Sequence, residues 1–163
     1  MLYCQLHIKS IMSTRSRKET TTYKKYHRSF HGKKGCVFCE IDSSSDQFVS
    51  ETNHFKVIDN IFPYSLWDDQ DVEDHLMIVP KKHTDTLSDL TPKEAQEYVL
   101  TMSSYEKKGY NVWARAPQSS IKSVMHQHTH LIKPGGKTMR FMFYMRKPYF
   151  RMRRLTLKNQ KIH

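Results

Sequence analysis

The feature that most constrains this chain is the segment His126-Gln127-His128-Thr129-His130, in which histidine occupies every second position. Side chains of a β-strand point alternately to its two faces, so the three imidazoles would share one surface if the segment is extended. The surrounding residues predict a strand over residues 124–132. Because each imidazole needs polar partners for two ring nitrogens, such a set is poorly suited to filling an apolar core.

Three interpretations of this histidine surface are open at this point. It can be the solvated face of a surface strand, it can hold a metal ion, or it can present one imidazole as a nucleophile. A neutral imidazole attacks phosphorus near pH 7 without first losing a proton, and its neighbours can fix its tautomer. The rest of the chain is needed to choose among them.

Alternating apolar residues elsewhere predict further strands. Residues 55–62 form a predicted strand that ends at Pro63, and residues 75–79 form a second that ends at Pro80. The two are expected to pair antiparallel across the acidic segment 66–74, which is predicted to be a loop. The other predicted strands are residues 110–115, 139–145 and 149–155, and a loop is predicted over residues 116–120.

One helix is predicted with well-defined ends. Thr91 is an N-cap, Pro92 suits the first turn, and Glu94 completes a capping box. Apolar residues follow at helical spacing, and Gly109 is placed to end the helix.

The net charge of +11 is concentrated at the two ends of the chain. Residues 1–35 carry +8 and residues 133–163 carry +10, whereas residues 36–132 carry −7. We therefore predict a basic, disordered leader over residues 1–34, one domain over residues 35–150, and a basic tail over residues 151–163. The basic ends are either solubilising or contact a nucleic acid or another polyanion.

Three cysteines do not make a disulfide framework, and two of them form the motif Cys36-x-x-Cys39. A reducing compartment fits this pattern, so a cytoplasmic location is expected, although the Ser-, Thr- and Arg-rich leader also fits a transit peptide. No run of 18 apolar residues is present, so no membrane span is expected.

Four motifs in one order resemble the histidine triad superfamily. HQHTHLI matches its H-x-H-x-H signature, and CVFCEI resembles its N-terminal cysteine element. NIFPYS with HLMIVPKKH resembles its central strand pair, and SVMH resembles the approach to the triad. The resemblance implies an α+β fold with an antiparallel sheet of about five strands, one main helix and a short one, often assembled as a homodimer.

The resemblance also implies roles for individual residues. His128 would be the nucleophile on the α-phosphorus, His130 would bond the phosphate or leaving group, and His75 would orient the triad. Ser123 would contact the leaving-group side. The expected nucleotide-binding residues are Asn60 at the ribose, Asn111 at the phosphate and Lys122 near the leaving group.

Cys36 and Cys39 alone supply only half of a tetrahedral site. The resemblance to zinc-bearing members implies that His83 and His126 complete a structural Cys₂His₂ zinc site and leave His128 free to react. The alternative is a reduced thiol pair packed in the core.

Several residues depart from the family pattern. Gln127 and Thr129 are polar where apolar residues are usual, so their face of the strand is expected either to be less buried than usual or to meet the basic C-terminal segment. Arg115 either reaches a phosphate or lies on the surface. Trp67 and Trp113 are expected to pack in the interior, with stacking on a base as the alternative.

Together these patterns predict a nucleotidyl hydrolase or transferase that acts on a phosphoramidate or a dinucleoside polyphosphate through a nucleotidyl-histidine. The alternative is a non-catalytic nucleotide or nucleic-acid binding module with basic arms.

Overall fold

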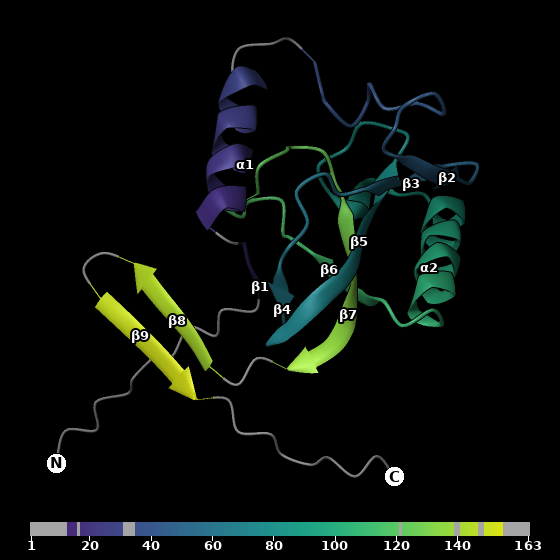
Figure 1. Ribbon diagram of the computed structural model, residues 1–163. Coiled ribbons are helices and arrows are strands. Elements are labelled where there is room, and N and C mark those ends of the chain that lie inside the picture. Colours follow the sequence, from purple (N-terminus) through teal and green to yellow (C-terminus); the bar gives the residue numbers. More distant parts are fainter. Residues whose placement is uncertain are drawn as a thin grey trace, which may run out of the picture.

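The centre of the fold is an antiparallel sheet built around the long strand β5 (Gln70–Pro80). The computed structural model describes residues 13–15, 17–30, 35–120, 122–138, 141–146 and 149–154. In the described sheet, β5 pairs with β3 (Phe55–Asp59), β4 (Leu66–Trp67) and β7 (Thr129–Thr138), as Figure 1 shows. The remaining strands of this sheet are β1 (Ser13–Thr14) on β4, β2 (Phe48–Glu51) on β3, and β6 (Asn111–Ala114) on β7.

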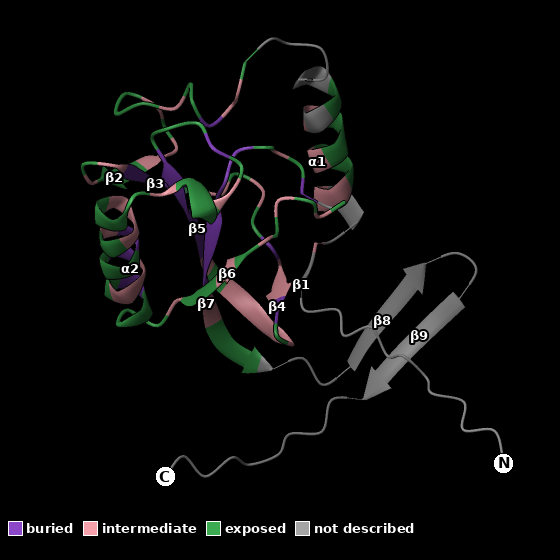
Figure 2. Ribbon diagram, turned by 180° about the vertical axis from the view of Figure 1, so that it is seen from behind, coloured by how far each residue is buried: buried purple, intermediate pink, exposed green. Residues whose placement is uncertain are grey.

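The two faces of the sheet bury different side chains. Successive residues of β5 alternate between them, so Leu76 and Ile78 face one way while His75, Met77 and Val79 face the other. The first face packs with Phe55, Val57 and Leu131 in one apolar cluster. On the second face, Met77 and Val79 pack with Ile58 and Phe38. Figure 2 shows the buried residues gathered along β3 and β5, where both faces are covered.

Helix α2 (Pro92–Glu106) covers the first face. Its start is as predicted: the Thr91 hydroxyl accepts from the Glu94 backbone, and the Glu94 carboxylate accepts from the Thr91 backbone at 2.7 Å. Tyr98 and Tyr105 bury their rings against the strands. The predicted helix is therefore confirmed, and Gly109 has the positive φ of 88° expected of a residue that turns the chain after a helix.

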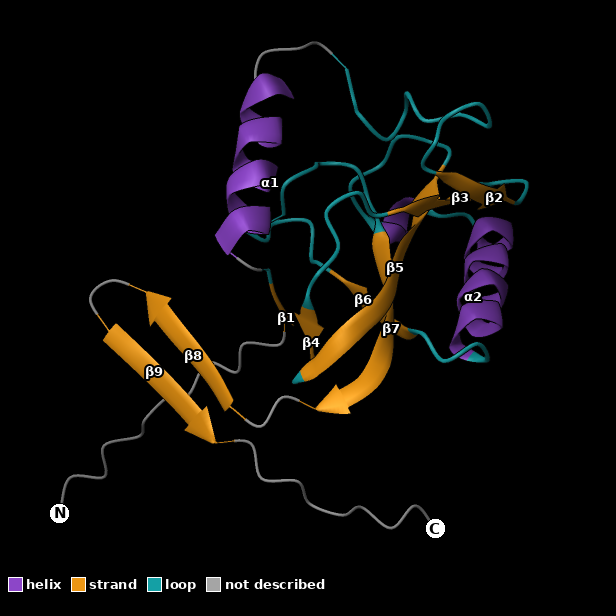
Figure 3. Cartoon of the chain, viewed as in Figure 1, coloured by secondary structure: helices purple, strands orange, loops and turns teal. Residues whose placement is uncertain are grey.

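The N-terminal region differs from expectation. Residues 1–34 were predicted to be disordered, but residues 17–30 form helix α1 (Arg17–Phe30), and β1 precedes it in the sheet. Figure 3 shows α1 and α2 on opposite sides of the sheet. Contacts with Phe62 hold α1, because Tyr23 and Tyr26 place their ring centroids 5.3 and 4.9 Å from it. Partners distant in sequence thus stabilise a polar segment that would not be helical alone.

The acidic segment 66–74 is not a loop, so that prediction was wrong. Its residues form β4 and the first half of β5, joined by a two-residue turn. Asp68 and Asp69 occupy this turn with φ values of 49° and 64°, which suit the hairpin turns that match strand twist. Aspartate tolerates this left-handed backbone better than most residues, which is why the segment can reverse direction here.

The predicted strand over residues 124–132 was partly wrong. Strand β7 begins only at Thr129, so of the three histidines in the motif only His130 lies in a strand. Residues 124–126 bend before it. Gln127 and Thr129 are also more buried than expected, with exposures of 2 % and 1 %. Each has a polar partner: Thr129 bonds the hydroxyl of Tyr98, and Gln127 accepts from Lys122.

The predicted α+β class with an antiparallel sheet and one main helix is confirmed. The described sheet has seven strands, because the two-residue strands β1 and β4 add to the number expected. The predicted C-terminal strands are β8 (Phe141–Arg146) and β9 (Tyr149–Arg154), which pair with each other. Among the described residues, every helix is too short or too polar to span a bilayer.

Candidate functional site

Four histidines meet on the second face of the sheet. In the pairing of β5 with β7, Met77 lies opposite His130 and His75 lies opposite Ile132, so the two histidines come from neighbouring strands on the same face. His128 precedes β7, and its ring centroid lies 5.1 Å from that of His130. His126 lies two residues before His128, and its ring contacts Cys36 and His83 instead.

The ring of His128 has one nitrogen committed to the backbone. Its Nδ1 lies 2.8 Å from the carbonyl oxygen of His126. A carbonyl can only accept, so Nδ1 carries the proton and Nε2 of the neutral ring keeps its lone pair. Phe38 packs against this ring with a centroid distance of 5.1 Å. His128 is thus held as a neutral base with one nitrogen available for bonding.

A chain of hydrogen bonds orders the protons of the next two rings. The backbone N–H of Tyr64 donates to Nδ1 of His75 at 3.1 Å, so the proton of neutral His75 lies on Nε2. His75 Nε2 then donates to Nδ1 of His130 at 2.9 Å. The proton of neutral His130 must therefore lie on its Nε2. The site therefore combines an N–H donor on His130 with a lone pair on His128, and the centroids of these two rings lie 5.1 Å apart.

The neutral state of these rings follows from burial. Burial, with smaller contributions from Arg15 and His128, lowers the pKa of His75 to about 3. Burial also places the pKa of His130 well below its ordinary value and lowers that of His128. Near neutral pH the site therefore offers uncharged imidazoles, which are the nucleophilic form.

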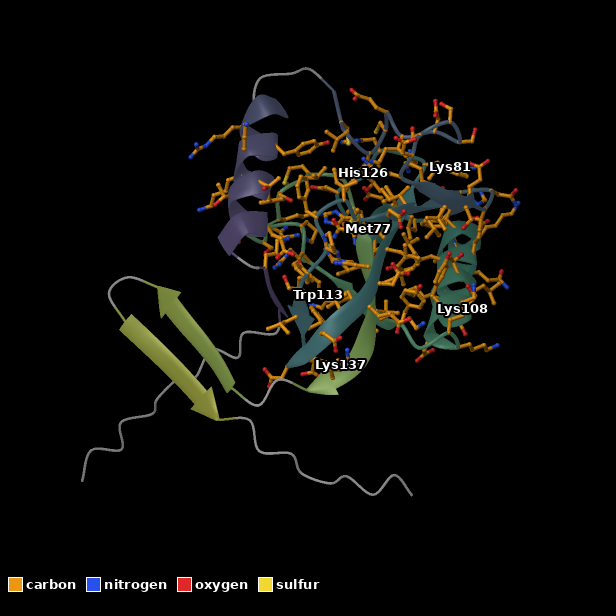
Figure 4. All side chains as sticks on the ribbon, viewed as in Figure 1. Met77, Lys81, Lys108, Trp113, His126 and Lys137 are labelled. Atoms are coloured by element: carbon orange, nitrogen blue, oxygen red, sulfur yellow. The ribbon has the colours of Figure 1, made fainter. Side chains whose placement is uncertain are left out.

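These rings open onto a cavity of about 400 Å³. His128 and His130 lie in its wall, with Asn60 and Ser123. The cavity is large enough for a nucleotide-sized ligand, and most of its surface is apolar and aromatic. The other lining residues that bear on recognition are Arg15, Tyr23, Tyr26, Ile61, Phe62, Tyr64 and Arg115. In Figure 4, the labelled His126 and Trp113 lie on the side of the sheet toward α1, away from Lys108 at the end of α2.

Next to this cavity, Cys36, Cys39, His83 and His126 bring four ligand atoms within 4.8 Å of one another, close enough to hold a metal ion. Cys36 Sγ lies 3.3 Å from His126 Nδ1, and Cys39 Sγ lies 3.3 Å from His83 Nδ1. Sulfur and nitrogen ligands of a tetrahedral zinc ion would be roughly 3.5 Å apart, given the usual bond lengths. The spacing of these donors therefore fits a small tetrahedral cation.

The protonation of His126 fits the same role. Its Nε2 lies 3.0 Å from the carbonyl of Pro80, so Nε2 carries the proton and the Nδ1 lone pair points at the sulfurs. Burial lowers the pKa of this fully buried ring to about 4, which keeps it neutral. Partial burial and the adjacent Cys36 raise the pKa of the Cys39 thiol. A bound cation would reverse that effect by stabilising the thiolates.

The expected nucleotide-binding residues divide into two groups. Asn60 lines the cavity and its Oδ1 accepts a hydrogen bond from the Phe62 backbone at 3.0 Å, and Ser123 also lines the cavity. Lys122 instead is buried and donates to the carbonyl of Asp85 and to Gln127. Asn111 is exposed at the start of β6. Neither of these two residues is among those that line the cavity.

Both tryptophans pack in the interior as expected. Trp67 is 5 % exposed, Trp113 is half-buried, and their ring centroids are 5.4 Å apart. Arg115 lies over the Trp113 ring and reaches the cavity wall.

Arg15 and Tyr64 are cavity residues that the sequence did not single out. Tyr64 stood within the quoted NIFPYS motif, so its position beside His75 carried a usable signal. Arg15 gave no signal, because its hydrogen-bond partner Phe62 lies 47 positions away in the chain.

The fold is α+β with an antiparallel sheet, and it places paired histidines at a nucleotide-sized cavity beside a cluster of four metal donors. These features define a site of the histidine triad type. The profile of the HIT domain matches residues 42–136, more than half of the chain, so the chain belongs to this family.

Several solved structures are similar to this chain. The chain is similar to a member of the HIT family from Bacillus subtilis, with a TM-score of 0.50 and 22 % identity over 63 % of this chain and 75 % of that chain. It is also similar to a HIT family hydrolase from Legionella pneumophila, with a TM-score of 0.47 and 24 % identity over 64 % of this chain and 96 % of that chain. A hypothetical protein from Leishmania major gives 0.48 and 20 %, over 79 % and 85 % of the two chains. No curated protein matches the sequence significantly.

Proposed function

We propose that this protein is a nucleotidyl hydrolase or transferase that cleaves its substrate at the α-phosphate. The single observation that carries the proposal is the pairing of His128, with its Nε2 lone pair, and His130, with its Nε2 proton, in one wall of a nucleotide-sized cavity. Nucleophilic displacement at phosphorus needs one group of each kind.

The proposed reaction has two steps. His128 Nε2 forms a bond to the α-phosphorus while the bond from phosphorus to the leaving group breaks, and the His130 Nε2–H donates a hydrogen bond to the leaving group, which departs as an anion or takes a proton from water. Water or another acceptor then attacks the nucleotidyl-histidine, gives its proton to the solvent, and releases the nucleotide and neutral His128. His75 acts through His130, because its hydrogen bond keeps the His130 proton on Nε2.

The proposed contacts to substrate follow from the cavity wall. Asn60 would hold the ribose and Ser123 the leaving-group side, since both line the cavity near the histidines. Lys122 and Asn111 take no part in this proposal.

We further propose that the metal is zinc and that it is structural. All four donors come from this chain, so they would close a tetrahedral site. His126 links the two sites, because its ring would bind the metal while its carbonyl accepts from His128 Nδ1. A metal bound there would hold the backbone that positions the nucleophile.

Mass spectrometry tests the proposed reaction. The full-length protein is mixed with an adenosine phosphoramidate or a diadenosine polyphosphate, quenched, and analysed for an adenylyl group on His128. We expect the adduct in the wild type and its loss in His128→Ala, which should still bind AMP. His54→Ala is the matched control, because His54 pairs with Glu97 outside the cavity. Retained turnover in His128→Ala, or no turnover of either substrate by the wild type, would overturn the proposal.

A further inference from the structure

The N-terminal segment lies outside the matched family domain, yet it contributes to the wall of the cavity. Strand β1 adds to the sheet by pairing Ser13 with Trp67 and Thr14 with Leu66. One residue later, Arg15 enters the cavity wall. The position of Arg15 is therefore set by the sheet that carries the histidines.

Helix α1 anchors the other side of Arg15. The Tyr23 and Tyr26 rings pack on Phe62, and Ser65 donates a hydrogen bond to Glu19. The segment is thus attached on both sides of Arg15, which limits the movement of its backbone.

The Arg15 guanidinium is placed for a further ligand. Its Nε and Nη2 donate to the carbonyl of Phe62 at 3.0 and 2.7 Å, and its Cζ lies 4.7 Å from the ring centroids of both Tyr23 and Tyr64. The two hydrogen bonds use two of the five N–H donors of an arginine. A guanidinium held between two rings by hydrogen bonds to the Phe62 carbonyl loses little freedom when it binds an anion.

A second guanidinium shares the same tyrosine. Arg115 Nη2 lies 3.4 Å from the Tyr64 hydroxyl, and Arg115 also lines the cavity. None of the described residues that line the cavity is an aspartate or a glutamate. The ion pairs found among the described residues involve neither arginine. Two like charges in a partly enclosed space therefore have no carboxylate among the described residues that line it, and an anionic ligand would relieve their repulsion.

We infer that Arg15 is a specificity-determining residue that binds the phosphates beyond the α-phosphate, so that the preferred substrate is a nucleoside polyphosphate or dinucleoside polyphosphate and not a phosphoramidate. The inference rests on the proposed function for the α-phosphate at His128. A phosphoramidate offers one phosphate group, and the histidines and Ser123 would bind it. Consecutive phosphates offer a second anionic group to the fork of Arg15.

Calorimetric binding of AMP and ATP to the full-length protein tests this role. Charge-assisted hydrogen bonds to an arginine correspond to about a tenfold to a hundredfold gain in affinity. We expect ATP to bind at least about tenfold more tightly than AMP, and Arg15→Ala to remove most of that difference while AMP binding changes less than about twofold. The matched control is Arg28→Ala, which removes the same charge from an exposed position of α1 and should leave both affinities unchanged.

A purely structural Arg15 would give a different result. If Arg15 only anchors the segment to Phe62, its replacement weakens AMP and ATP equally, and Arg15→Lys does the same. If Arg15 binds phosphate, Arg15→Lys keeps part of the preference for ATP, because the charge is retained without the fork. Equal losses for both nucleotides, or an unchanged preference for ATP in Arg15→Ala, overturn the inference.

Turnover separates this inference from the proposed function. Preferential hydrolysis of a diadenosine polyphosphate over a phosphoramidate, lost in Arg15→Ala, supports both. A wild type that binds ATP through Arg15 but forms no adduct on His128 leaves the inference standing and overturns the proposed reaction. If the wild type forms the adduct and neither binding nor turnover depends on Arg15, the proposed reaction stands and the inference about Arg15 is overturned. If neither nucleotide binds, both fail.

Discussion

His75 and His130 are 55 positions apart in the chain, yet His75 Nε2 lies 2.9 Å from His130 Nδ1 in the buried interior. The backbone N–H of Tyr64 occupies the other nitrogen of His75. The direction of the hydrogen bond between the two histidines is therefore set by a peptide group, and this in turn decides which nitrogen of His130 carries its proton.

This ordering predicts the effect of replacing His75. In His75→Ala, His130 loses the donor to its Nδ1, so its proton is no longer held on Nε2. We expect kcat on a nucleotidyl substrate to fall about tenfold or more while AMP affinity changes little. Nitrogen-15 NMR of the histidine rings should show the change of His130 tautomer directly. An unchanged tautomer with unchanged kcat would show that His75 does not position His130; His54→Ala serves as the control.

Burial of His75 also predicts acid sensitivity. Its folded pKa is about 3, below the 6.5 of an unperturbed histidine, because burial disfavours the charged ring. The unfolded state therefore binds the proton first as the pH falls, so the stability due to neutral His75 is complete above pH 6.5 and declines from there toward pH 3. At pH 5 this loss is about 2 kcal/mol from one such group.

Urea unfolding at pH 7.5 and pH 5.0 measures this loss. The wild type should lose more stability between the two pH values than His75→Gln does, because glutamine does not titrate. If both proteins lose the same amount, the acid sensitivity comes from other groups.

The elements that the sequence predicted correctly depend on near neighbours. The capping box of α2 needs only Thr91 and Glu94, three positions apart, and the short-range pattern of apolar residues located β3 and the second half of β5. The metal cluster joins Cys36 to His126 across 90 positions. Spacing alone could not have brought these residues together, and the family resemblance supplied the expectation.

What the sequence missed depends on distant contacts. A segment with one acid and many bases was predicted to be disordered, because nothing local shows that Tyr23 and Tyr26 have Phe62 as a partner. The turn at Asp68 and Asp69 looked like part of an acidic loop, since charge obscured the strand pattern on either side. The outer limits of the domain, a cytoplasmic or organellar location, homodimer formation and contact of the basic ends with nucleic acid stay predictions.

Removing the N-terminal segment should destabilise the domain. A protein that begins at residue 31 loses the β1 pairing and exposes Phe62 and Trp67, which are apolar rings covered by the segment or next to it. We expect a loss of about 1–3 kcal/mol in urea unfolding, from the burial of one to two such side chains. Arg28→Ala, at an exposed position of α1, is the control, and it should leave stability unchanged. Equal stability of all three proteins would show that α1 does not stabilise the domain.

Metal removal should affect both stability and the nucleophile. Elemental analysis should find one zinc per chain, and Cys39→Ser should lose it, since serine is a poor zinc ligand. We expect a lower Tm and a lower rate of adduct formation, because His126 would no longer hold the backbone that orients His128. His54→Ala is the matched control, because His54 pairs with Glu97 and is not one of the four donors. Full activity in metal-free Cys39→Ser would separate the two sites.

The buried hydrogen bond between Tyr98 and Thr129 predicts a coupled pair of mutations. Thr129 is 1 % exposed, so Tyr98→Phe leaves its hydroxyl without a partner, and Thr129→Val does the same to the hydroxyl of Tyr98. Each single change should cost about 1–3 kcal/mol, because a buried polar group then lacks its partner. The double variant leaves neither hydroxyl, so it should cost less than the sum by at least about 1 kcal/mol. Urea unfolding of the four proteins closes this cycle. Additive losses would mean that the hydroxyl of Thr129 has other partners and that its burial has another cause.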